Sequence, residues 1–200
     1  KISQAGRDVV GMMVRDIRMA GYKYFNDTIK THDKHAPIII TKSGDFKTAC
    51  DKIEIVYGDV FYNKDATKPE DKYKYERWKV TYKCKGSTVE DKSKQPDQSG
   101  KYPSIRAFAI YKSKERWPDA ENATDWLDPA TDGDIRTYKE EVIVDYVQDL
   151  IFNAVDEKGL VIKPPPTTTN ANKDKLFKIK TVDILLNVRS TKEFFKKKKI

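Results

Sequence analysis

The stretch RDVVGMMVRDIRMAGY, residues 7–22, decides how the rest of the chain is interpreted. Its apolar residues Val9, Met13 and Ile17 recur every fourth position, and at about 100° per residue they form one stripe of a helix. Gly21 follows, and glycine readily takes the left-handed conformation that ends a helix. The sequence therefore predicts an amphipathic N-terminal helix whose Val9, Met13 and Ile17 pack against a sheet. We interpret its start within the first residues, without an initiator Met, as a cut in a longer helix.

The end of this helix, RDIRMAGY at residues 15–22, resembles the DLRxAGY signature of PilW-type minor pilins of type IV pili. Related J-type pseudopilins of type II secretion have a similar helix end. Three later segments resemble strands of the same family in the same order, namely DKIEIVY (51–57), EEVIVDYVQDLIF (140–152) and TVDILLNVRS (181–190). The resemblance implies an α+β fold, with a long N-terminal helix packed on an antiparallel β-sheet. It also implies a single pilin-like soluble domain over residues 1–200.

The same resemblance implies a structural role without enzymatic activity and without a cofactor. Such a subunit helps to initiate or cap assembly of a type IV pilus-like filament, with other minor pilins and the major pilin as partners. An apolar helix upstream of residue 1 attaches it to the inner membrane. The expected location is therefore extracytoplasmic, at the inner membrane and periplasm before assembly and on the cell surface afterwards. The resemblance does not distinguish a pilus from a secretion pseudopilus.

The charge of the chain leaves a second class of function open. Its 39 basic and 31 acidic residues give a net charge of +8. This excess is typical of a well-solvated surface, and it also suits an extracellular binding module for DNA or another polyanion. Tyr73, Tyr75, Trp78 and Tyr82 lie among lysines and fit base stacking, but Trp78 and Tyr82 have strand spacing that favours a core.

Alternation of apolar and polar residues predicts the strands. They are expected at 51–57, 78–84, 105–111, 141–146, 150–155 and 176–190, the last with a bend near Lys180, and a short apolar run predicts one more at 38–41. Polar composition predicts mobile loops near 85–103 and 164–174. The histidines, His32 and His35, lie in a polar segment interpreted as a surface loop, and no catalytic motif accompanies them.

Three aspartates are candidate calcium ligands. Asp128, Asp132 and Asp134 surround Gly133, and closely spaced carboxylates around a glycine turn can bind calcium. An EF-hand loop in this frame would need ligands where Ala130 and Lys139 stand. The site is therefore either a weak calcium site or a turn of solvated carboxylates.

The two cysteines, Cys50 and Cys84, are predicted to form a disulfide. Cys50 precedes the strand at 51–57 and Cys84 ends the strand at 78–84, so antiparallel pairing brings them together. A register with Cys50 opposite Cys84, however, puts Glu54 rather than Ile53 and Ile55 on the face of Trp78. Two buried thiols are the alternative.

Overall fold

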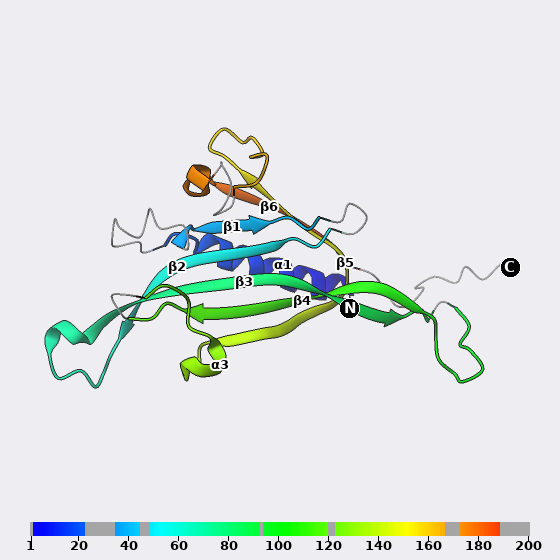
Figure 1. The fold of residues 1–200 in the computed structure, drawn as a ribbon, viewed down its shortest axis with the longest axis horizontal. Helices are drawn as coiled ribbons and strands as arrows, with labels where there is room; N and C mark the ends of the chain where they lie inside the picture. The colour runs from blue at the N-terminus through cyan, green and yellow to red at the C-terminus, as the bar shows by residue number, and fades with distance from the viewer. Residues whose placement is uncertain are drawn as a thin grey trace.

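The computed structural model describes residues 2–22, 35–44, 49–92, 94–119, 123–166 and 173–188. One six-stranded antiparallel sheet in the order β1-β2-β3-β4-β5-β6 organises them (Figure 1). Its strands are β1 (Ile38–Thr41), β2 (Lys52–Tyr62), β3 (Tyr73–Glu90), β4 (Ser104–Arg116), β5 (Tyr138–Val155) and β6 (Thr181–Val188). The helices are α1 (Ile2–Arg18), η2 (Pro69–Lys72), α3 (Pro129–Asp132) and η3 (Lys173–Lys178).

The predicted α+β fold with a long helix on a sheet is wrong. The chain is mostly antiparallel β, its sheet curls into a half-barrel, and α1 is the only helix of seven or more residues in the described part. The strands are longer than predicted because alternation continues through charged segments, so that β3 and β5 each reach 18 residues. Such a strand spans about 60 Å, whereas a helix of this length spans about 25 Å.

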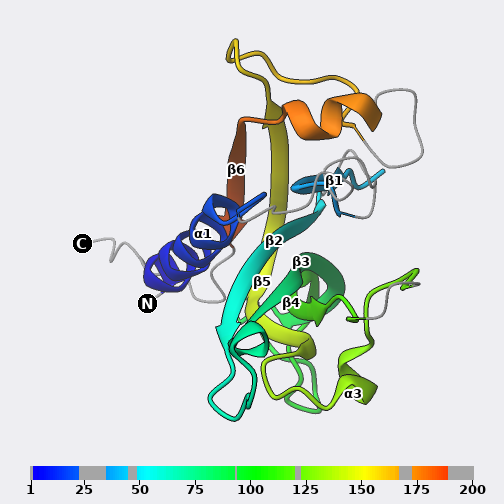
Figure 2. The same cartoon turned by 90° about the vertical axis from the view of Figure 1, so that its left-hand side faces the viewer.

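The helix α1 contributes part of the hydrophobic core. Val9 and Met13 are buried in one cluster with residues of β2 to β5, and Ile17 is partly buried against the same cluster. Figure 2 shows α1 on one side of the curled sheet, beside β6. Gly6 of α1 lies close to Val188, since a Cβ at Gly6 would be 3.6 Å from its Cγ2. The apolar stripe of the helix therefore faces strands that are distant in sequence.

The hairpin of β2 and β3 carries the predicted alternation. Ile53 pairs with Tyr82, Ile55 with Val80 and Tyr57 with Trp78, so the apolar faces of the strands coincide. Trp78 is 2% exposed and Tyr82 is 0% exposed, which places both in the interior rather than on a stacking surface.

Several boundaries differ from the prediction. The segments 141–146 and 150–155 belong to one strand, β5, which is irregular at Tyr146 (φ 66°) and between Val147 and Asp149. The expected strand at 176–190 begins only at Thr181, because η3 occupies 173–178; the change of phase marks a helix–strand boundary rather than a bend within a strand. Residues 85–90 of the predicted mobile loop lie in β3, and residues 167–172 of the second loop lie outside the described part.

No helix in the described part of the chain is long and apolar enough to cross a membrane.

Candidate functional site

The predicted disulfide between Cys50 and Cys84 is confirmed, with 5.9 Å between their Cα atoms. The register problem is resolved because Cys50 does not continue β2. It leaves the β2–β3 ladder before Lys52 and forms an isolated bridge with Leu150 of β5. The bond therefore ties β3 to the point where the chain before β2 meets β5.

A buried aspartate joins that same point. Asp51 is 2% exposed, and its carboxylate accepts hydrogen bonds from the backbone N–H of Phe152 at 2.9 Å, the N–H of Ser43 at 3.0 Å and the Lys42 ammonium at 2.8 Å. The backbone N–H of Asp51 donates to the carbonyl of Leu150 at 2.8 Å. We call Lys42, Asp51 and Phe152 the seam, because they join the start of β2 to the distant strand β5. The carboxylate satisfies a buried N–H that the sheet ladder leaves unpaired.

A second joint lies at the end of α1. The Tyr82 hydroxyl donates to Asp16 at 2.6 Å, and the Lys112 ammonium lies 2.7 Å from the same carboxylate. Gly21 ends the helical segment with φ of 70° and donates its N–H to the carbonyl of Val56. A side chain at Gly21 would both strain this backbone and approach Pro37 to 3.4 Å. Asp16 and Gly21 thus fix the end of the helix to β2, β3 and β4.

A groove opens beside this joint. It has a volume of about 530 Å³ and is lined by Met19, Tyr57, Lys112, Lys114, Arg136 and Tyr138, among others. Lys112, Lys114 and Arg116 lie at alternate positions of β4 and therefore share the face of Trp78, Val80 and Tyr82. This row was not predicted from the sequence, because the strand was expected to end at Tyr111. The alternation of Lys112, Lys114 and Arg116 in KSKER (112–116) is the sequence signal that could have predicted the row.

The cations of this row have different partners. Lys112 pairs with Asp16, and Arg116 donates to Asp132 at 2.6 Å. The ammonium of Lys114 lies 4.2 Å from the centre of the Trp78 ring, and Lys114 forms no ion pair with any described residue. Burial, with the nearby charges of Arg136 and Lys112, lowers the pKa of Lys114. Lys114 is therefore the cation of this row that no carboxylate of the described residues contacts directly.

The tyrosines of the groove stay protonated. Burial, helped by the negative charge of Asp16, raises the pKa of Tyr57 to about 12. Burial and Asp16 likewise raise the pKa of Tyr138. Protonated phenols donate hydrogen bonds, so the groove presents two hydroxyl donors beside an ammonium.

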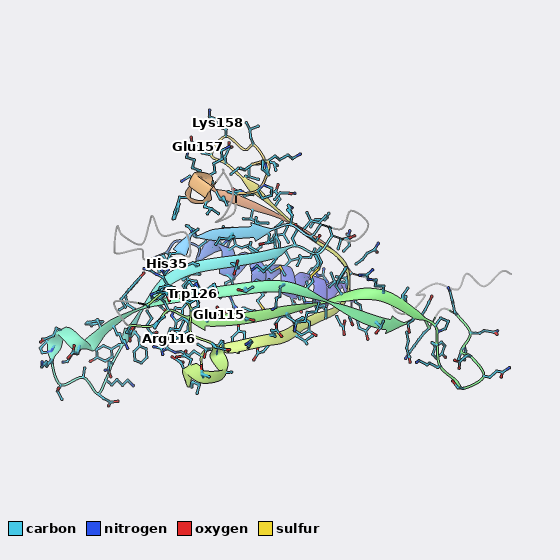
Figure 3. The ribbon with its side chains drawn as sticks, viewed as in Figure 1. His35, Glu115, Arg116, Trp126, Glu157 and Lys158 are labelled. Carbon is cyan, nitrogen blue, oxygen red and sulfur yellow. A yellow bond between two sulfur atoms is a disulfide. The ribbon has the colours of Figure 1, made fainter. Side chains whose placement is uncertain are left out.

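The candidate calcium ligands bind cations of the protein itself. Asp128 caps α3 by accepting from the N–H of Ala130 at 3.1 Å. Asp132 is 1% exposed at its side chain and pairs with Arg116, which Figure 3 shows near α3. Asp134 pairs with Arg136, whose guanidinium lowers the pKa of Asp134 to about 2. Among the described residues, no three His, Cys, Asp or Glu side chains form a candidate metal cluster.

The other face of the sheet holds an aromatic cluster. His35 is 4% exposed, with its ring 4.3 Å from Trp117 and 5.6 Å from Trp126, as the labels in Figure 3 help to locate. The interpretation of His35 as a surface-loop residue is wrong, because the chain after β4 folds back over it. The backbone N–H of Trp117 donates to the carbonyl of Arg77 and so holds this segment in place. His32 lies outside the described residues.

Comparisons of the chain with protein-family models, with curated proteins and with solved structures find no match.

Proposed function

We propose that the protein is a structural subunit, a minor pilin or pseudopilin, that helps to initiate or cap an extracytoplasmic pilus-like filament. Its partners are other minor pilins and the major pilin, and an apolar helix encoded ahead of residue 1 holds it in the inner membrane before assembly. No catalytic step is part of this function. The disulfide is compatible with an oxidising compartment.

One observation carries the proposal. The four segments that resemble the pilin pattern are joined by hydrogen bonds, although as many as 101 residues separate the bonded partners. Gly21 of the helix segment binds Val56, Asp51 binds Phe152, and Asp149 accepts from Asn187 of β6 at 2.9 Å. Polar residues of the pattern, such as Asp51 and Asp149, make hydrogen bonds that join the segments. Four segments that match the family pattern and also contact one another support common ancestry with pilins better than four matching segments without mutual contacts would.

The sheet edge formed by β6 is the surface we assign to subunit contact. Within the described part of the sheet, β6 is an edge strand with no strand paired to its outer side. Leu185 of β6 is 51% exposed there. An exposed edge with apolar side chains is typical of a surface that another strand or subunit covers.

Binding of DNA is the less favoured function because the lysines of β3 already have partners. Lys83 and Lys85 both pair with Glu140, and Lys79 pairs with Glu115. Paired lysines release fewer counterions on binding a polyanion, so the expected affinity and salt dependence are weak. A salt titration of DNA binding measures both.

The first experiment examines the coding sequence upstream of Lys1 and the protein content of the filaments. The sequence upstream of Lys1 should encode a short basic leader and about 20 apolar residues, the length that spans a bilayer. An epitope-tagged full-length protein should co-purify with filaments sheared from the cells of its natural host. Deletion of the gene should reduce the number of filaments. An upstream sequence without such an apolar segment, or a tagged protein absent from filaments, would refute the proposal.

The second experiment tests the β6 surface with a matched pair of variants. Leu185→Asp places a charge on the exposed edge and should block incorporation into filaments. Leu160→Asp makes the same change at a residue that is 62% exposed in the turn after β5, and incorporation should persist. Both variants should keep the melting temperature of the parent protein, since neither leucine is buried. Equal incorporation of both would exclude the β6 edge as the contact surface.

A further inference from the structure

We propose that the groove between the end of α1 and the β2–β5 face binds a small monocarboxylate with an apolar body. This ligand site is separate from the filament contact at β6 and does not depend on it. The carboxylate would lie against Lys114, Tyr57 and Tyr138, and the apolar body against Met19 and Ile135.

The hydrogen-bond inventory of the groove points to an anion. Within the described residues, the Lys114 ammonium and the hydroxyls of Tyr57 and Tyr138 have no hydrogen-bond acceptor. Lys114 is paired across the sheet with Tyr138, so their side chains leave the same face at neighbouring positions. Tyr57 stands opposite Trp78, the ring that Lys114 covers. Three donors without acceptors on one partly buried surface are suited to an oxyanion.

The charged residues that line the groove favour a ligand with one negative charge. Asp16 neutralises Lys112, and Arg136 donates to both Glu76 and Asp134 at 2.6–2.9 Å. Arg15 is 74% exposed at its side chain and lies 3.7 Å from Asp16, so solvent screens its charge. Lys114 is left as the one partly buried cation without a carboxylate among the described residues of the groove. One such cation balances a monoanion and leaves a dianion such as phosphate unbalanced.

The apolar residues of the lining are the reason for proposing a ligand with an apolar body. Ile135 lines the groove and is 99% exposed, although it follows directly after the ion-paired Asp134. Met19, which is partly exposed, supplies further apolar surface in the same lining. A ring or branched chain on the carboxylate would remove this surface from water, and that burial stabilises binding roughly in proportion to area.

The test is a nuclear magnetic resonance titration of the folded chain with benzoate as the probe. The amide shifts should saturate and centre on residues around Lys114, Tyr138 and Ile135. Benzoate should bind about tenfold or more tightly than acetate, which lacks the ring, because burial of the ring adds to binding. Benzyl alcohol, which lacks the charge, and inorganic phosphate should both bind more weakly than benzoate.

Matched variants test whether Lys114 and Tyr138 contribute to the binding of benzoate. Lys114→Gln should raise the Kd for benzoate about tenfold or more, since a hydrogen bond to a charged group is lost. Tyr138→Phe removes one hydroxyl without changing the fold of the strand and should raise the Kd about fivefold. Lys158→Gln changes an exposed lysine in the turn after β5, labelled in Figure 3, and should leave the Kd unchanged.

Four results would overturn the proposal. They are the absence of saturable shifts, equal affinity for benzoate and benzyl alcohol, tighter binding of phosphate than of benzoate, and an unchanged Kd in Tyr138→Phe. If Lys114→Gln does not fold, the Tyr138→Phe variant decides the question by itself.

Discussion

Removal of the Asp51 carboxylate should open the seam between β2 and β5. In Asp51→Ala, the Phe152 N–H loses its acceptor inside the protein, and an unsatisfied buried donor costs about 1–3 kcal/mol. The bond from the Ser43 N–H contributes about 1 kcal/mol more. Lys42 adds only about 0–1 kcal/mol, because a third of its side chain is exposed to water. The expected loss in the free energy of unfolding is therefore about 2–5 kcal/mol.

Urea denaturation followed by circular dichroism measures this loss. Since each kcal/mol shifts the melting temperature of a chain of this size by about 2–4 °C, the variant should melt about 10 °C below the parent protein. Asp51→Asn keeps an acceptor for Phe152 and should lose about half as much stability. Glu157→Ala, at an exposed residue labelled in Figure 3, is the control and should change stability by less than about 0.5 kcal/mol.

A loss below about 1 kcal/mol in Asp51→Ala would contradict the reasoning, because it would mean that the buried N–H finds another acceptor. A loss equal to that of Glu157→Ala would show that the seam does not hold the two strands together. Either result would also remove the main support for reading the four matched segments as one structural unit.

Three further predictions follow from other joints of the structure. Thiol labelling of the denatured, unreduced protein should find no free thiol at Cys50 or Cys84, and reduction should lower stability by about 3–4 kcal/mol, given a sequence separation of 34 residues. The Tyr82→Phe variant should lose about 1–3 kcal/mol of stability in urea denaturation, because the bond to the partly buried carboxylate of Asp16 is lost. The pKa of Asp134 lies below its usual value, so its contribution of about 2 kcal/mol is present above pH 4 and is lost as the pH falls towards 2. The stability of Asp134→Asn should fall less than that of the parent protein over this range, and a parallel fall would assign the acid sensitivity to other groups.

Local patterning determined much of the chain. The spacing of Val9 and Met13 specifies one face of a helix, and the alternation around Ile53 and Tyr82 specifies strands, because both signals depend only on the period of the backbone. The disulfide could also be predicted from the sequence, because the positions of the cysteines at the ends of two neighbouring strands limit which sulfurs can meet. The length of the strands could not be predicted from the sequence, because charged residues on the outward face of β3 to β5 give these segments the composition of loops.

Only the tertiary structure decided which polar residues act together. Asp51 and Phe152 are 101 residues apart, and Asp16 and Tyr82 are 66 residues apart, so no local period relates them. The same holds for Asp132, whose position beside Gly133 suggests calcium, whereas the fold places Arg116 of β4 against it instead. A carboxylate binds whichever cation or N–H the fold places within about 3 Å, and that choice depends on strand register and sheet curvature rather than on the neighbouring sequence.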